Sequence, residues 1–160
     1  MHSKIFQVSA TPINADNYTS PEFFYDSCSG WADYIGEPCE GDERKDCIKH
    51  LQSRFSDLFD LDETGEVLIY KGGLDEFKKE WAEAIRNAAA QINEDTVLKW
   101  SKRRDLVRAC EETHLETSYR FSIEKWDTYA HAAKEFVEYI ADTLKVGDKV
   151  YIGAVIDFHI

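Results

Sequence analysis

The fold class follows most directly from residues 149–160, KVYIGAVIDFHI. Every even-numbered residue from Val150 to Ile160 is apolar, and Tyr151 and Val155 add apolar groups at odd-numbered positions. Because successive side chains point to opposite faces of a strand, one face of this segment is wholly apolar and the other is partly so. Such a run is typical of a strand that is covered on both faces. We therefore predict a strand well inside a sheet.

The preceding segments alternate between strand and helix patterns. Apolar residues at every second position predict further strands, and apolar residues three or four positions apart predict helices. Some ends are marked by capping or breaking residues: Ser20 precedes Pro21 at the start of the first predicted helix, and Gly36 and Pro38 follow its end. The predicted strands lie at residues 4–9, 58–59, 67–70, 119–123 and 150–160, and the predicted helices lie between Ser20 and Ile35, Asp42 and Leu58, Phe77 and Ile92, Asp95 or Thr96 and Cys110, and Asp127 or Thr128 and Ile140.

This order, βααββααβαβ, is that of an α+β fold. With 160 residues, the chain is close to the usual size of one domain. Hydrophobic residues make up 43% of it, which indicates a packed core rather than a disordered chain. We expect a single α+β domain over residues 1–160, with a mixed or antiparallel sheet of about five strands covered by helices.

The overall charge disfavours several classes of partner. The chain has 31 acidic and 19 basic residues, a net charge of −12, which disfavours direct nucleic-acid binding by the surface as a whole. There is no apolar run of the length that a secretion signal or a membrane span needs, so we expect a cytoplasmic protein without membrane contact. Cys28, Cys39, Cys47 and Cys110 are expected to be reduced and mostly buried thiols.

The negative charge is concentrated in the first part of the chain. Residues 1–66 hold 14 acids and 5 bases, whereas residues 67–160 hold 17 acids and 14 bases. Such a concentration either keeps the protein soluble or forms a docking face for a basic protein surface. Phe23, Tyr25 and Tyr34 lie among these acids and would supply aromatic anchors. The predicted partner-binding residues surround the junction of the first two predicted helices: Asp33, Tyr34, Glu37, Glu40, Asp42, Glu43 and Asp46.

A second candidate site follows Leu58 and Phe59. The sequence Asp60-Leu-Asp62-Glu-Thr64 resembles the haloacid-dehalogenase phosphatase signature, which implies Asp60 as nucleophile, Asp62 as general acid and Mg²⁺ on the phosphate. That family places a helix behind the signature, whereas here Gly65 and a strand pattern follow. Asp, Thr and Gly are also the residues that turns select, so we expect a hairpin turn. The same stretch resembles a calcium loop, but Lys71 takes the place of its bidentate carboxylate.

Three other groupings combine residue types that can carry chemistry. Cys47 and His50, with Cys39 nearby, have the spacing of zinc ligands, although the apolar neighbours of Cys47 favour a core thiol. Asp127, His131 and Glu135 share one helix face, which we expect to be solvated. Asp157 and His159 share the less apolar face of the last strand, where we expect helix cover or simple exposure. We therefore expect no catalytic residue, no metal and no cofactor.

A basic segment lies in the second half of the chain, within ten residues. We expect it to pair with the protein's own acidic helices or with the acidic face of another copy, which allows a head-to-tail homo-oligomer. No glycine-rich loop or stacking platform accompanies these cations, which disfavours a nucleic-acid site. The residues are Lys99, Lys102, Arg103, Arg104 and Arg108.

Four segments resemble parts of small acidic proteins encoded on bacterial mobile elements and phages. They are IFQVSATPI at 5–13, FYD at 24–26, WADYI at 31–35 and YIGAVID at 151–157. Small acidic proteins of such elements resemble inhibitors of host defence, including antirestriction and anti-CRISPR proteins, some of which present carboxylates where DNA phosphates would bind. The resemblance implies a non-catalytic acidic protein that inhibits a nucleic-acid-binding host-defence protein. The alternatives are a Mg²⁺-dependent phosphatase using Asp60 and Asp62, and a soluble interaction domain without an inhibitory role.

Overall fold

The computed structural model describes residues 2–25, 32–111, 118–124 and 130–159. The chain divides into two compact units, of which the first joins Met1–Gly72 to Ser118–Ile160 and the second is Gly73–Thr117. The prediction of one domain over residues 1–160 stays a prediction.

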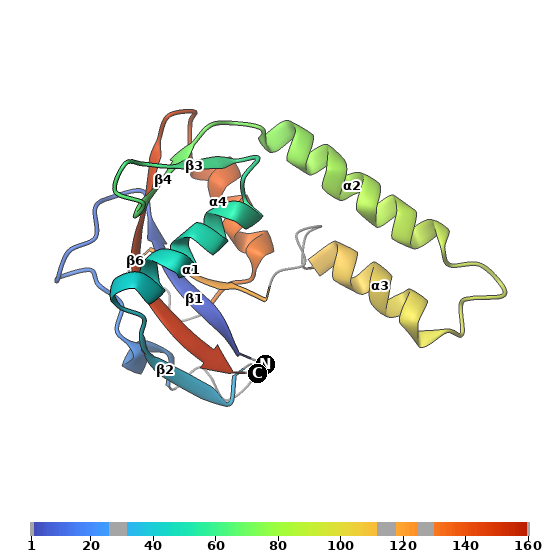
Figure 1. Ribbon diagram of the computed structural model, residues 1–160. Helices are drawn as coiled ribbons and strands as arrows, with labels where there is room; N and C mark the ends of the chain where they lie inside the picture. The colour runs from blue at the N-terminus through green and yellow to red at the C-terminus, as the bar shows by residue number, and fades with distance from the viewer. Residues whose placement is uncertain (1, 26–31, 112–117, 125–129, 160) are drawn as a thin grey trace. The chain divides into compact units, whose positions relative to one another are not determined.

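The first unit is built on a mixed sheet whose central strand is the apolar segment singled out in the sequence (Figure 1). One edge of this strand, β6, pairs antiparallel with β1 along most of its length. The other edge pairs with β4 near its start and with β2 near its end. β3 extends the sheet beyond β4, and β5 extends it beyond β1 as a parallel neighbour. The α+β fold is therefore confirmed, with six strands rather than about five. The strands are β1 (His2–Ser9), β2 (Tyr34–Pro38), β3 (Phe59–Leu61), β4 (Val67–Tyr70), β5 (Arg120–Ile123) and β6 (Lys149–His159).

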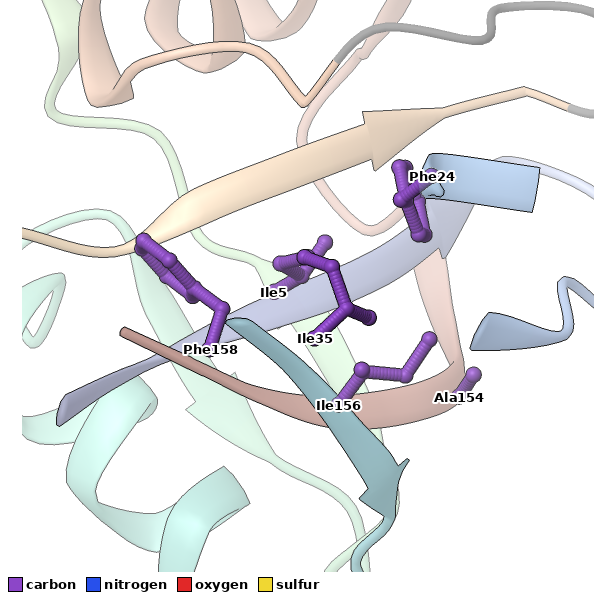
Figure 2. Close-up of a cluster of buried hydrophobic side chains, with 6 residues drawn as sticks. All are labelled: Ile5, Phe24, Ile35, Ala154, Ile156 and Phe158. Atoms are coloured by element: carbon purple, nitrogen blue, oxygen red, sulfur yellow. The ribbon is translucent and has the colours of Figure 1, made fainter. Parts of the chain in front are cut away.

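Helices α1 (Gly41–Arg54) and α4 (Ala133–Thr143) cover one face of this sheet (Figure 1). The two helices contact the sheet through aromatic rings. Phe136 of α4 stacks on Phe121 of β5 with ring centroids 4.3 Å apart, and Phe55 at the end of α1 contacts both rings edge-on. The opposite face carries a second buried cluster, shown in Figure 2. Its members are Ile5, Phe24, Ile35, Ala154, Ile156 and Phe158.

Side chains complete the hydrogen bonding of β6 where its neighbouring strands stop. The Arg44 guanidinium of α1 donates to the carbonyls of Ile152 and Gly153 at 2.7 and 3.1 Å, in the interval between the β4 and β2 pairings. On the β1 side the register shifts, and the buried Gln7 amide accepts hydrogen bonds from the backbone N–H groups of Ala154 and Thr19. Buried backbone groups need such partners, so both side chains belong to the sheet.

The first predicted helix is wrong. Residues Pro21–Phe24 form only a short 3-10 helix, η1, and Tyr34–Pro38 form strand β2, which pairs with β6. Pro38 would remove a helical hydrogen bond, whereas it is tolerated on an edge strand such as β2. Gly36 suits the strand as well, because a Cβ there would lie 3.2 Å from the Tyr34 ring and from the Cβ of Asp157. Cys28 and Trp31, which we placed on that helix, lie outside the described residues.

The last predicted helix begins later than expected. It starts at Ala133, and His131 instead forms an isolated antiparallel bridge with Phe121, with two backbone hydrogen bonds of 2.8 Å. Pairing with the sheet therefore replaces the first turn that the pattern predicts. The predicted caps Asp127 and Thr128 lie outside the described residues.

The second unit is a helical hairpin of α2 (Leu74–Ala90) and α3 (Trp100–Glu111) (Figure 1). Both helices were predicted, although α3 starts after a turn in which the Thr96 hydroxyl accepts from the Asn93 N–H at 2.8 Å. The Trp81 indole of α2 donates to the carbonyl of Ala109 in α3 at 2.6 Å. Within the described part of the chain, no helix has the length and apolar character that crossing a bilayer requires.

Candidate functional site

The seven predicted partner-binding residues lie along β2 and the first turns of α1, not at a junction of two helices. Asp33 directly precedes β2, Tyr34 and Glu37 lie on it, Glu40 caps α1, and the rest follow within α1. All seven are exposed. We call this set the acidic edge: Asp33, Tyr34, Glu37, Glu40, Asp42, Glu43 and Asp46.

Exposed aromatic rings accompany the acidic edge. Tyr34 is 52% exposed, Tyr25 48% and Phe23 40%, although rings of this size are usually more buried. Tyr25 lies close enough to its acidic neighbours to be affected by them: partial burial raises its pKa, and the charges of Glu22 and Glu37 raise it further. η1 and β2 thus present rings and carboxylates together.

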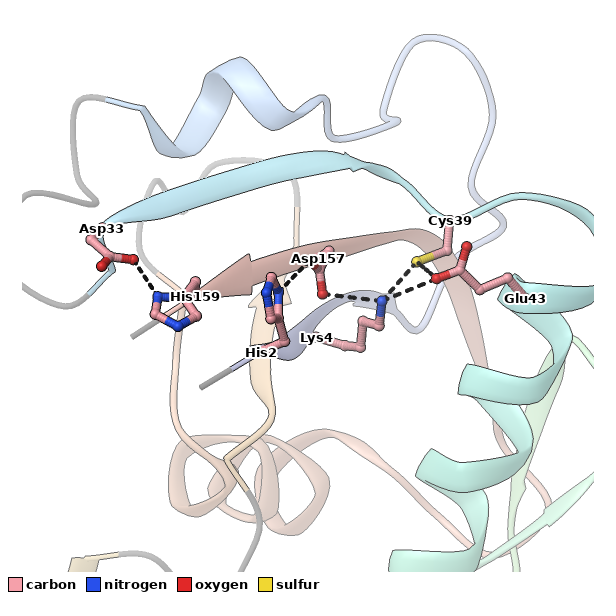
Figure 3. A network of polar contacts seen from close by, with 7 residues as sticks. All are labelled: His2, Lys4, Asp33, Cys39, Glu43, Asp157 and His159. Atoms are coloured by element: carbon pink, nitrogen blue, oxygen red, sulfur yellow. Dashed lines mark hydrogen bonds and ion pairs between the residues drawn. The ribbon is translucent and has the colours of Figure 1, made fainter.

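Lys4 is the centre of a polar network between β1, β6 and the start of α1 (Figure 3). Its ammonium lies 3.1 Å from Asp157 Oδ1, 3.2 Å from Glu43 Oε1 and 3.3 Å from Cys39 Sγ. Burial alone would lower the pKa of Lys4, but the hydrogen bonds to Asp157 and Cys39 and the bond to Glu43 raise it above its usual range. Lys4 therefore stays charged and holds Glu43 to the sheet.

Two histidine–aspartate pairs lie beside Lys4. His2 Nδ1 is 2.8 Å from Asp157 Oδ2, and His159 Nδ1 is 2.7 Å from Asp33 Oδ1. The imidazoles are in edge contact, with centroids 5.0 Å apart. The hydrogen bond to His159 lowers the pKa of Asp33. The face that Asp157 and His159 share is thus neither fully covered nor simply exposed: it carries an ordered set of polar contacts (Figure 3).

A pocket of about 620 Å³ opens next to this network. Strands β1 and β6 form one wall, and α1 forms another with side chains that recur at helical spacing. Tyr119, half-buried and packed edge-on against Phe6, closes it. The charged and ring-bearing side chains that line it include Lys4, Glu43, Asp46, His50, Tyr119 and Asp157.

The thiols near this pocket are weak nucleophiles and weak ligands at neutral pH. Burial raises the pKa of Cys39 to about 11, and burial also raises the pKa of Cys47. Cys47 is half-buried at the pocket rather than in the core, which corrects the prediction, and Cys110 is exposed. Cys28 lies outside the described residues. Among the described residues, no group of three or more His, Cys, Asp or Glu side chains is arranged to hold a metal ion.

The residues of the phosphatase-like motif lie in a β-hairpin, as the turn pattern predicts. β3 and β4 pair antiparallel, and Asp60 faces solvent beside Lys71 at 3.3 Å. Asp62 accepts from the Thr64 hydroxyl at 2.7 Å and from two backbone N–H groups. The turn therefore accounts for Asp62, and the two aspartates do not converge on one site.

The remaining candidates do not join the pocket. Glu135 lies on α4, 3.9 Å from Lys134, while His131 precedes that helix and Asp127 lies outside the described residues. The basic segment lies on and just before α3 in the second unit, where the Arg103 guanidinium lies 5.6 Å from the centre of the Trp100 ring.

The sequence did not identify His2 and Lys4 as site residues, because their shared partner Asp157 lies 153 or more positions further along the chain. A strand pattern at the start of the chain predicts a strand there, but it does not predict which residues of another strand lie opposite. No protein-family model, curated protein or solved structure matches this chain.

Proposed function

We propose that this protein is a non-catalytic binding protein whose acidic edge docks on a basic protein surface. The observation that carries the proposal is the exposure of Phe23, Tyr25 and Tyr34 beside carboxylates. Aromatic side chains dominate the energetics of protein interfaces, and charges around them set encounter rate and register. A surface whose only task is solubility has no use for three exposed rings.

The distribution of charge supports a basic partner. The first unit holds 21 acids and 11 bases, so it carries −10 of the net charge of −12. Within the described residues, no ion pair engages Glu37, Glu40, Asp42 or Asp46. Unpaired carboxylates create a potential that attracts cations and repels phosphates. The same potential disfavours nucleic acid as the direct ligand.

The partner that fits best is a nucleic-acid-binding groove. Such grooves are lined with lysines and arginines that neutralise phosphates, and a row of carboxylates can occupy the same positions. On the sequence resemblance to small acidic proteins of mobile elements, we propose that the protein inhibits a host-defence protein. The expected place of this inhibition is the cytoplasm.

The test uses charge reversal on acids that make no fold contact. Glu37→Lys, Glu40→Lys and Asp42→Lys together should abolish capture of the partner. Wild type should compete with nucleic acid for the captured protein, and this triple variant should not. A matched control reverses Glu83, Glu94 and Asp95, which are exposed in the second unit, and gives the same net charge of −6. Equal loss in both triple variants would leave only a solubilising role for the acidic edge.

The aromatic contribution has a separate readout. Tyr34→Ala should raise the dissociation rate on the order of thirtyfold, because a buried aromatic anchor contributes about 2 kcal/mol or more. Salt should instead slow association, since the screening length falls from about 10 Å at 0.1 M to about 3 Å at 1 M. Surface plasmon resonance resolves the two rates. If the dissociation rate of Tyr34→Ala is unchanged, the Tyr34 ring is not part of the interface.

A further inference from the structure

The pocket beside Lys4 has the volume and the polarity of a ligand site. Its volume of about 620 Å³ falls in the range of roughly 300–1,000 Å³ that small-ligand sites occupy. Two members of the acidic edge, Glu43 and Asp46, line it from one turn of α1. The pocket is therefore continuous with the proposed docking surface.

From this geometry we infer that the pocket receives an arginine side chain of the basic partner, with its guanidinium between Glu43 and Asp46. The inference rests on the proposed function only for the identity of the protein that supplies the arginine. The preference of the pocket for a guanidinium follows from the contacts of the pocket itself.

The cation already in the pocket is fully engaged. An ammonium has three N–H donors, and Lys4 has three acceptors, on Asp157, Glu43 and Cys39. Lys4 therefore has no donor left for an anionic ligand. Three carboxylates face one ammonium, so the pocket as a whole attracts a further cation.

The unused acceptors lie on one side of the pocket. Lys4 and Cys39 both engage Glu43 Oε1, and among the described residues no hydrogen bond engages Glu43 Oε2 or the Asp46 carboxylate. These two carboxylates are three residues apart on a helix and therefore point the same way. A guanidinium carries five N–H donors in a plane and can bind both, which an ammonium cannot do as well.

A ring on another wall suits the same ligand. Tyr119 lines the pocket and does not belong to α1, and the face of a tyrosine ring attracts a guanidinium that lies over it. Tyr119 therefore adds a favourable contact for a cation in the same pocket as Glu43 and Asp46.

The test uses a defined probe rather than an unidentified partner. NMR titration of the full chain with N-acetyl-arginine methylamide should shift the amide signals of Cys47, His50 and Ser118 in a saturable way. The citrulline analogue has the same shape without the charge and should bind at least about tenfold more weakly, since charge-assisted hydrogen bonds are roughly twice as strong as neutral ones. Asp46→Asn should weaken arginine binding by about tenfold, and Asp57→Asn, an exposed change in the turn that follows α1, should leave it unchanged.

Each outcome decides between separate claims. Equal affinity for the arginine and citrulline probes, shifts caused by inorganic phosphate instead, or no effect of Asp46→Asn would overturn the assignment. If partner capture depends on Glu37, Glu40 and Asp42 but the pocket does not bind arginine, the proposed docking surface stands and the pocket is not part of it. If the pocket binds arginine but no such capture occurs, the assignment of the pocket stands and the proposed function is wrong.

Discussion

At Gly153, the central strand β6 has no side chain and so leaves room for the Gln7 side chain of the neighbouring strand β1. A Cβ at Gly153 would meet Gln7 Oε1, and it would lie 2.7 Å from Gln7 Cδ and 2.9 Å from Ile13 Cδ1. Gly153→Ala should therefore lower the free energy of unfolding by about 1–3 kcal/mol, the usual cost of overpacking. Chemical denaturation measures the change. In a Gln7→Ala background the same substitution should cost less, and equal costs in both backgrounds would show that Gln7 is not the obstacle.

Asp62 links the hairpin turn to pH. The hydrogen bond from Thr64, and the backbone N–H groups of Glu66 and Val67, lower the pKa of Asp62 below its ordinary value of 3.8. A depressed folded-state pKa contributes stability above the unfolded-state pKa, and this contribution is lost as the pH falls through the folded-state value. Thr64→Val should therefore raise the pKa of Asp62 and move acid unfolding to higher pH. Carbon-detected NMR titration of the Asp62 carboxylate follows this directly, and an unchanged pKa would contradict the role of the hydroxyl.

For single residues, the sequence indicated which side chains can carry chemistry, but it did not indicate which of these side chains are in contact. The alternation of residues 149–160 put Asp157 and His159 on one face, and the structure keeps them there. Their partners His2 and Asp33 could not be found, because each pairing depends on the register between strands that are far apart in the chain. The acidic edge could be assembled in advance since its seven members lie within 14 consecutive positions.

At the scale of elements, β2 shows how a helical spacing can mislead. Phe24, Cys28, Trp31 and Ile35 recur at three or four positions, but Phe24 and Ile35 meet in one cluster by packing on the sheet from η1 and β2. Tertiary pairing with β6 overrides the local pattern. α2 was predicted reliably because its stripe of apolar residues continues over four turns and no Pro interrupts it.

Arg44 connects α1 to the segment of β6 that lies between its pairings with β4 and β2. The packing of α1 on the sheet should depend on this contact. Its guanidinium satisfies two carbonyls of β6 and pairs with Glu66 at 3.0 Å. Arg44→Met should lower the free energy of unfolding by about 2–3 kcal/mol, because hydrogen bonds to charged groups contribute about 1.5–3 kcal/mol each and the stranded carbonyls lose their partners.

Two variants separate the carbonyl contacts of Arg44 from its ion pair. Arg44→Lys should recover little, since one ammonium cannot reach both carbonyls and Glu66 in the geometry of a guanidinium. Glu66→Gln should cost less than about 1 kcal/mol, because Glu66 is half-exposed. Urea denaturation compares the three proteins. A larger loss in Glu66→Gln than in Arg44→Met would mean that the ion pair, and not the strand contact, holds the helix.

At the scale of the whole molecule, charge and burial divide the chain in the same way. The first unit holds both buried clusters and −10 of the net charge, and the second unit is nearly balanced, with 10 acids and 8 bases. Length and composition favoured a single core and gave no sign of this division, because α2 has an apolar stripe like that of any core-facing helix.

The two units should therefore differ in local stability. Among the described residues of the second unit, Phe77 is the only buried one, whereas β1 and β6 are buried over most of their length. Two helices with so little buried apolar surface are marginally stable, because most helical stability in proteins comes from packing of an apolar face, and amides that exchange by local opening report that directly. In hydrogen–deuterium exchange, amides of α2 and α3 should be less protected than those of β1 and β6 by roughly a hundredfold or more. A bound partner at the acidic edge should increase protection at β2 and α1 and leave that of α2 and α3 unchanged. Equal protection in the free protein would mean that the helical hairpin and the sheet open as one cooperative unit, in agreement with the expectation of a single domain.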